Sequence, residues 1–322
     1  MKRMIPLKKK TLKIALSALG ATSAALLYSS IHFYKQAVKN KRSTAPLDYD
    51  LINVVPNDPW EEEKLWFQKV ERDTLTIQSQ DALTLKAMLV EHEQANKKVA
   101  ILAHGYSGTS KEMAPFAKLF YDLGFTIVLP DARGHGDSEG DYIGFGWPER
   151  HDYLAWIDSL INRYGQDTEI VLFGISMGGA TVLNVSGEAL PDQVKAIVED
   201  CGYSSVEKEL SYQLKNLYKL PSYPFIPMTS LLTKYKAGYS FTEASPVDQV
   251  KKSSTPTLFI HGDKDSFVPT DMAYELYQAA ASDKALYIVH GAEHAYSYVT
   301  DKDEYRRQVT RFLSRYLTHT IS

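Results

Sequence analysis

The 322-residue chain has one cysteine, Cys201, and a net charge of only −3. A single cysteine excludes an intramolecular disulfide framework and any zinc site made of several cysteines. Acidic and basic residues are interspersed along the chain, which argues against a nucleic-acid partner. The sequence also lacks repeats, low-complexity tracts, the zinc spacing HExxH and the calcium-loop spacing. We therefore expect no metal and no cofactor.

The N-terminal segment is unusual in its charge pattern. Six basic residues fall within positions 1–13, and residues 14–34 then carry no formal charge. At about 1.5 Å per residue, a helix of this length crosses a ~30 Å hydrocarbon core. The small excess of bases before the segment predicts a single-pass protein of the cell membrane, anchored by residues 1–42, with its globular domain on the extracellular side. Secretion after cleavage near residues 18–20 is the alternative, followed by a buried helix.

Short apolar runs alternate with helical patterns from about residue 65 to residue 322. Because most runs lack strict alternation of polar and apolar residues, they predict strands that are buried on both faces of a parallel sheet. Residues 75–80 and 83–91 do alternate, and they predict an antiparallel pair at the start. The fold class is therefore α/β, with helices on both faces of a mostly parallel sheet and ligands at the carboxyl ends of the strands. Residues 43–64 contain three prolines and are interpreted as a linker.

About fifty residues, 203–254, separate two of the predicted strands, which is far longer than an ordinary connection. Prolines break this segment into helical pieces, and aromatic residues are frequent in it. We interpret it as a cap inserted over the site. Its aromatic side chains either form a small core of the cap or line a pocket for an apolar substrate.

The stretch FGISMGGA, residues 173–180, places Ser176 between a strand pattern and a helix pattern. A nucleophilic serine needs this strand-to-helix turn, with small neighbours such as Gly174 and Gly178. The alternative is a serine that only caps the helix. A weakly nucleophilic hydroxyl also needs a histidine base and a carboxylate, which follow the serine in this fold.

Two strand ends downstream supply these partners. HGDKD offers Asp263 and Asp265, and HGAEH offers His290 and His294. We assign Asp265 and His294, because both lie on the loops beyond the strand ends, whereas Asp263 is placed to brace its own turn. The remaining requirement is a pair of N–H donors for the oxyanion. The glycine-containing turn HGYSG provides the amide of Tyr106, and the amide of Met177 follows the serine.

With these five motifs in order (HGYSG, DARGHGDS, GISMGG, HGDKD and GAEH), the chain resembles the α/β-hydrolase superfamily over about residues 70–318. It is most similar to bacterial membrane-anchored or exported serine hydrolases of the esterase and lysophospholipase-like group. The resemblance implies a triad of Ser176, Asp265 and His294. We predict a serine hydrolase that cleaves carboxylic esters of short to medium acyl chain, from a small molecule or a lipid. A peptidase, a lysophospholipase or an acyltransferase are alternatives, and a non-catalytic binding protein is the least favoured one.

Overall fold

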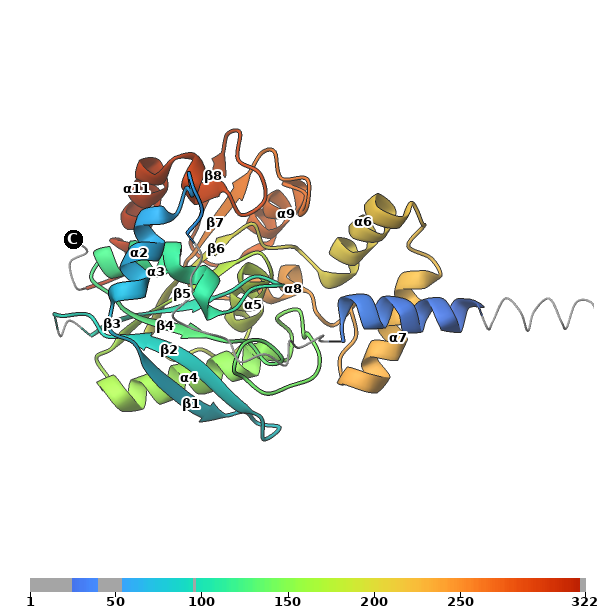
Figure 1. Cartoon of the computed structure of the whole chain (residues 1–322), viewed down its shortest axis with the longest axis horizontal. Coiled ribbons are helices and arrows are strands. Elements are labelled where there is room, and N and C mark those ends of the chain that lie inside the picture. The colour runs from blue at the N-terminus through green and yellow to red at the C-terminus, as the bar shows by residue number, and fades with distance from the viewer. Residues whose placement is uncertain (1–24, 40–53, 95–96, 319–322) are drawn as a thin grey trace, which may run out of the picture.

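An eight-stranded sheet forms the centre of the computed structural model, which describes residues 25–39, 54–94 and 97–318 (Figure 1). The strand order is β1-β2-β4-β3-β5-β6-β7-β8. β2 runs antiparallel to both of its neighbours, and all other pairs are parallel. The strands are β1 (Asp73–Gln78), β2 (Thr84–Val90), β3 (Lys98–Ala103), β4 (Thr126–Pro130), β5 (Glu169–Ile175), β6 (Val194–Asp200), β7 (Thr257–Gly262) and β8 (Lys284–Val289).

The burial of the strands explains the apolar runs in the sequence. Every residue of β3, β4, β5 and β7 is buried, whereas β1 alternates between exposed and half-buried positions at the sheet edge. A strand covered on both faces cannot place polar residues at every second position. The predicted α/β class, with a mostly parallel sheet, is confirmed.

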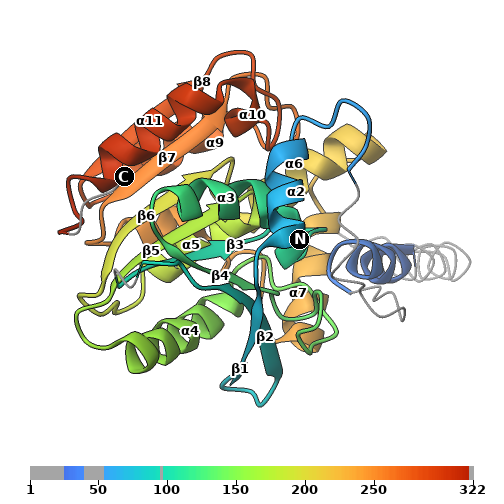
Figure 2. The ribbon, with the colours of Figure 1, turned by 60° about the vertical axis from the view of Figure 1, so that its left-hand side comes forward.

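Helices cover both faces of the sheet (Figure 2). One face packs against α2 (Glu61–Lys69), α3 (Ala114–Asp122) and α11 (Lys302–Leu313), which share a core that includes Phe120 and Phe312. The other face packs against α4, α5, α8 and α9. Their bounds are α4 (Glu149–Tyr164), α5 (Met177–Ser186), α8 (Pro246–Val250) and α9 (Asp271–Ala279), and the short helices η1 (Ser110–Met113) and α10 (Ser297–Thr300) lie in loops.

Two helices between β6 and β7 stand away from the sheet. They are α6 (Val206–Tyr218) and α7 (Phe225–Ala237), and they lie within the residues predicted as a cap. Residues 25–37 form a further helix, called the N-terminal helix below, which lies beside α6 and α7 in both views (Figures 1 and 2). The first turn of α2 includes residues 61–64, at the end of the segment interpreted as a linker.

The predicted membrane span, residues 14–34, is corrected by the structure. Residues 14–24 and the candidate cleavage region at 18–20 lie outside the described residues. Over 25–39, 54–94 and 97–318, no helix has the length and apolar character that a bilayer crossing requires. Residues 25–38 instead pack against the cap, where Tyr34 and Val38 join a core shared with cap side chains. The predicted localisation, a single-pass membrane protein with an extracellular domain, is therefore wrong.

Candidate active site

Ser176 lies at the sharp turn between β5 and α5, in a backbone conformation that favours glycine. Its φ and ψ are 57° and −118°. The turn is tight because a Cβ on Gly174 would lie 2.0 Å from the carbonyl oxygen of Gly178, and a Cβ on Gly178 would lie 2.0 Å from that of Ala103. The Ser176 N–H donates to the carbonyl of Asp200 at 2.8 Å, which anchors the turn to β6. Such a strained backbone persists only where the surrounding structure imposes it. The turn places the serine hydroxyl above the edge of the sheet.

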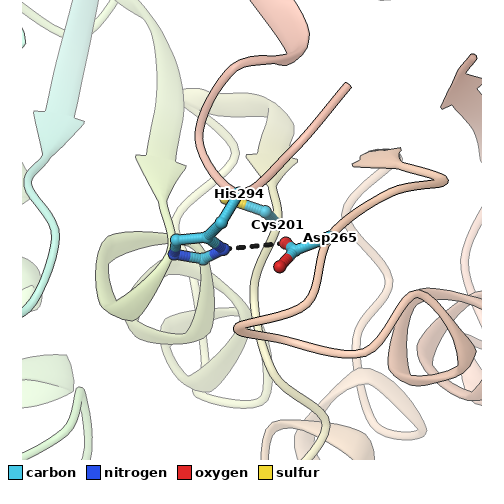
Figure 3. A group of neighbouring side chains, drawn as sticks. All are labelled: Cys201, Asp265 and His294. Carbon is cyan, nitrogen blue, oxygen red and sulfur yellow. Dashed lines mark hydrogen bonds and ion pairs between the residues drawn. The ribbon is translucent and has the colours of Figure 1, made fainter. Parts of the chain in front are cut away.

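The structure brings the three residues of the predicted triad together. The Oγ of Ser176 lies 2.9 Å from Nε2 of His294. On the other side of the imidazole, Nδ1 of His294 lies 2.7 Å from Oδ2 of Asp265 (Figure 3). A carboxylate only accepts, so Nδ1–H donates to Asp265 and leaves the lone pair of Nε2 for the serine hydroxyl. This is the tautomer in which a histidine can take a proton from serine.

Asp265 is buried yet well supplied with hydrogen-bond donors. The N–H groups of Phe267 and Val268 both donate to its Oδ1 at 2.8 Å. Its Oδ2 faces Nε2 of His261 at 3.2 Å in addition to His294. Burial alone would raise the pKa of Asp265, but the hydrogen bonds from His261 and His294 outweigh it and lower this pKa to about 2. The group is therefore a carboxylate at neutral pH.

The rejected members of each pair have other partners. Asp263 accepts from the N–H of Gly291 at 2.7 Å and lies 2.6 Å from Nδ1 of His290, so it joins its loop to the loop after β8 and does not brace its own turn. The side chain of His290 is 93% exposed and does not pack at the strand end. Asp200, a further carboxylate at the end of β6, accepts from Ser297 and Tyr305. Asp263, His290 and Asp200 therefore take no part in the hydrogen bonds that link Ser176, His294 and Asp265.

The loop after β3 carries Tyr106 next to the serine. A Cβ on Gly105 would lie 3.7 Å from the Cβ of Ser176, so the backbones approach closely. His104 Nδ1–H donates to the Gly105 carbonyl at 2.8 Å, and His135 Nε2–H donates to the Tyr106 carbonyl at 2.9 Å. Because a trans peptide unit is planar, fixing the Gly105 carbonyl also fixes the Tyr106 N–H on the opposite side. Met177 is the first residue of α5, where an N–H has no acceptor within the helix.

The two histidines that hold this loop were not assigned a role from the sequence. The signal for them is their position, since His104 ends the β3 pattern and His135 lies in the turn after the β4 pattern, at the same sheet edge as Ser176. Their mutual ring contact, with centroids 4.9 Å apart, brings the two loops together. Burial and the neighbouring His135 lower the pKa of His104 to about 4, which keeps its ring neutral.

Two cavities meet at Ser176. The first, of about 280 Å³, lies under the cap and is lined mainly by apolar side chains of the cap helices and the N-terminal helix, such as Leu214, Ile226 and Phe33. The second, of about 730 Å³, opens on the side of His294 and is lined also by Lys64 and Lys111. Phe267 borders both, with its ring centroid 4.9 Å from that of His294. The serine therefore faces an apolar space on one side and a larger, partly charged one on the other.

The aromatic side chains of the cap serve both of the uses left open by the sequence. Tyr239 is buried in the cap core and donates to the Ile143 carbonyl at 2.6 Å. Tyr203, Tyr218 and Phe241 line the first cavity. The contribution of the N-terminal helix to this cavity was missed, because its lack of charge was interpreted as a membrane span. The polar residues Ser29, Ser30 and His32 within that run were the signal against it.

One group of possible metal ligands coincides with the triad. Among the described residues, Cys201, Asp265 and His294 offer ligand atoms within 4.8 Å of one another (Figure 3). Burial raises the pKa of the Cys201 thiol well above its ordinary value, so a thiolate ligand is disfavoured. A metal bound here would also compete with the hydrogen bond between Asp265 and His294. The arrangement fits a proton relay better than a metal site.

The sheet order and a serine at the β5–α5 turn define the class of the protein. It is a serine hydrolase with the α/β-hydrolase fold. An esterase of Pyrococcus furiosus, Pf2001, has the same fold: the two structures align with a TM-score of 0.65, at 22% sequence identity, over 82% of this chain and 96% of the esterase.

Sequence comparison gives the family. The model of the prolyl oligopeptidase family, Peptidase_S9, matches residues 112–320, and the chain belongs to this family. It is 30% identical to the uncharacterized protein YqkD of Bacillus subtilis, over 94% of this chain and 97% of that one. It is also 25% identical to a thermostable monoacylglycerol lipase of a Bacillus species, over 56% of this chain and 76% of the lipase. The family match includes Ser176, Asp265 and His294 but not Tyr106 or the N-terminal helix.

Proposed function

We propose that the protein hydrolyses carboxylic esters of short to medium acyl chain through a covalent acyl-enzyme formed on Ser176. The observation that carries this proposal is the continuous hydrogen-bonded chain from Ser176 through His294 to Asp265, at the mouth of an apolar cavity. The monoacylglycerol lipase among the relatives supports an ester substrate. The cavity volume of about 280 Å³ lies just below the roughly 300–1,000 Å³ that is usual for ligand pockets, which favours short chains over long ones.

Each residue has one task in this mechanism. The Ser176 oxygen attacks the ester carbonyl while its proton passes to Nε2 of His294, and the negative Asp265 stabilises the imidazolium. The N–H groups of Tyr106 and Met177 bind the oxyanion, each contributing about 10²–10³ in rate. The imidazolium then protonates the leaving oxygen, and the alcohol departs. Water repeats the sequence on the acyl-enzyme and releases the acid.

The position of His294 distinguishes the two sides of the site. Because the imidazolium must give its proton to the leaving oxygen, the alcohol part of the substrate belongs on the His294 side. This is the larger cavity, which is lined by His294, Lys64 and Lys111. The acyl chain then occupies the apolar cavity under the cap. A polar alcohol such as glycerol or a phosphoglycerol fits this division, so a lysophospholipid belongs to the same substrate class.

A peptide substrate is the second candidate, favoured by the family match and by Glu209. This residue lines the cavity under the cap, and its Oε2 is buried without a hydrogen-bond partner. A carboxylate in that position would bind the amino group of a peptide. However, burial raises the pKa of Glu209 to about 7, partly offset by a hydrogen bond from Gln213, so the charged form is costly at neutral pH. The ester therefore remains the better supported substrate.

A substrate panel tests the proposal. The purified chain is given p-nitrophenyl esters from acetate to palmitate, monoacylglycerols, a lysophospholipid, and alanine p-nitroanilide with and without an N-acetyl group. We expect kcat/KM to be highest for butyrate to octanoate esters, and to disappear in Ser176→Ala. If the free-amine anilide is cleaved faster than every ester, and Glu209→Gln loses that preference, the protein is a peptidase and the ester proposal is wrong. Cleavage of none of these compounds would contradict both.

A further inference from the structure

The N-terminal helix is docked on the catalytic domain through its C-terminal end. The N–H of Ile143 donates to the carbonyl of Val38 at 2.7 Å, and Lys39 forms a β-bridge with Tyr142. Val38 is fully buried in the core that the cap helices share. These contacts are made by main-chain atoms and by a buried side chain, so they hold the helix in one position against the domain.

The face of this helix that turns toward the cap is aromatic. The ring of Phe33 lies 5.3 Å from that of Tyr218 on α6 and 5.9 Å from that of Phe225 on α7, both edge-on. The helix thus lies against both cap helices. Another face is open to solvent, since Leu27 and Tyr28 are 55% and 73% exposed.

The same helix closes the cavity beside Ser176. Phe33, Gln36 and Ala37 line it together with Leu214 and Leu217 of α6. The cap alone therefore does not enclose the space for the acyl chain, and the helix supplies part of the wall. Substituting one of these side chains by a larger or smaller one would change the volume of the cavity and leave the residues of the triad unaltered.

Tyr106 connects the helix to the reaction centre. Its hydroxyl donates to the carbonyl of Ala37 at 2.8 Å, and burial raises the pKa of this phenol to about 12, so it remains a donor. Its backbone N–H is the donor proposed for the oxyanion. One residue thus contacts the helix with its side chain and the reacting carbonyl with its amide, which places the helix close to the bound acyl group.

We propose that the N-terminal helix forms a wall of the acyl site, and that Phe33 and Ala37 on it determine which acyl chains the enzyme accepts. This rests on the function proposed above and adds its specificity. Phe33 bounds the cavity between α6 and α7, so its ring limits the length or branching of the chain. Ala37 is small and lines the same cavity beside the Tyr106 hydroxyl, so it leaves room there for the acyl chain.

Two substitutions with opposite effects on the cavity test this proposal. Phe33→Ala enlarges the cavity and Ala37→Leu reduces it, and Leu27→Ala on the exposed face is the matched control. The measurement is kcat/KM across p-nitrophenyl esters from acetate to palmitate. We expect Phe33→Ala to move the preference toward longer chains, and Ala37→Leu to move it toward acetate, each changing the long-to-short ratio by about 10-fold or more. Leu27→Ala should keep the wild-type ratio.

A fluorophosphonate probe and thermal unfolding distinguish failure of the proposed function from failure of the proposal about the helix. If the wild type neither reacts with the probe nor cleaves an ester, the proposed function fails. If all variants react with the probe and unfold as the wild type does, but their chain-length profiles are unchanged, the helix is not a wall of the acyl site. A uniform loss of activity toward every ester in Phe33→Ala, with an unchanged profile in Ala37→Leu, also overturns the proposal, because it would show a structural role only.

Discussion

The sheet edge that holds Ser176, Asp265 and His294 differs in construction from the cavity that surrounds the serine. At the sheet edge, each side chain follows the end of a strand, and short-range contacts fix it: the glycines around Ser176 and the two N–H donors of Asp265. The cavity is assembled from helices far apart in the sequence, including residues 25–37 and 206–237. Local backbone rules thus determine the chemistry, whereas long-range packing determines what reaches it.

Loss of the carboxylate at the sheet edge should have the largest effect. Asp265→Asn keeps the size of the side chain but favours the wrong tautomer of His294, so we expect kcat to fall by about 10⁴-fold. The measurement is the hydrolysis of a short p-nitrophenyl ester. Asp263→Asn, two residues away, is the matched control, since Asp263 pairs with exposed His290 and should be nearly silent. A loss of equal size in both variants would contradict the assignment of Asp265.

A change at the turn should reveal how tightly the sheet edge is packed. Gly178→Ala places a Cβ 2.0 Å from the carbonyl oxygen of Ala103, so we expect a loss of about 3 kcal/mol in the free energy of unfolding. Denaturant unfolding measures it. Gly108→Ala is the control, because its Cβ would meet its nearest neighbour at 3.5 Å, an ordinary contact. Equal stability of the two variants would show that the turn is not sterically constrained.

The charge on Asp265 predicts a pH dependence of stability. Its pKa in the folded protein is about 2, below the ordinary 3.8, so its stabilising effect is complete above about pH 4 and is lost as the pH falls toward 2. The shift is worth about 2 kcal/mol. Unfolding free energies measured across this window should fall more steeply in the wild type than in Asp265→Asn. Parallel curves would mean that the pKa of Asp265 is not lowered in the folded state.

The smallest expected effect lies where the two regions meet. Tyr106→Phe removes one hydrogen bond to the Ala37 carbonyl, which contributes about 1 kcal/mol to the docking of the N-terminal helix. Amide hydrogen exchange over residues 33–38 should then become about 5-fold faster. Tyr274→Phe, an exposed position on α9, is the control and should leave this exchange unchanged. Unchanged exchange in Tyr106→Phe would mean that the hydroxyl does not hold the helix.

The same contrast explains how much the sequence predicts. The strands, the turn at Ser176 and the choice of Asp265 and His294 follow from local patterns, and the structure brings these residues within hydrogen-bonding distance. The place of Phe33 and Ala37 in the cavity wall does not follow, because it depends on where a distant helix docks. The uncharged run at residues 14–34 favoured a membrane helix over a buried one, and the contacts of Tyr34 and Val38 with cap side chains, which support the buried helix, depend on long-range packing. His104 and His135 were missed for a related reason, since their role depends on two loops meeting at one edge.

The central claim, that Ser176 is the nucleophile, is tested most directly by covalent labelling. A fluorophosphonate reacts only with a serine activated by its base, and mass spectrometry of the digested protein locates the adduct. The account predicts one phosphonate on Ser176 in the wild type and none in Ser176→Ala. Labelling should also be strongly reduced in His294→Gln, which removes the base and leaves the hydroxyl in place. A wild type that takes up no probe, or an adduct that survives Ser176→Ala, would contradict it.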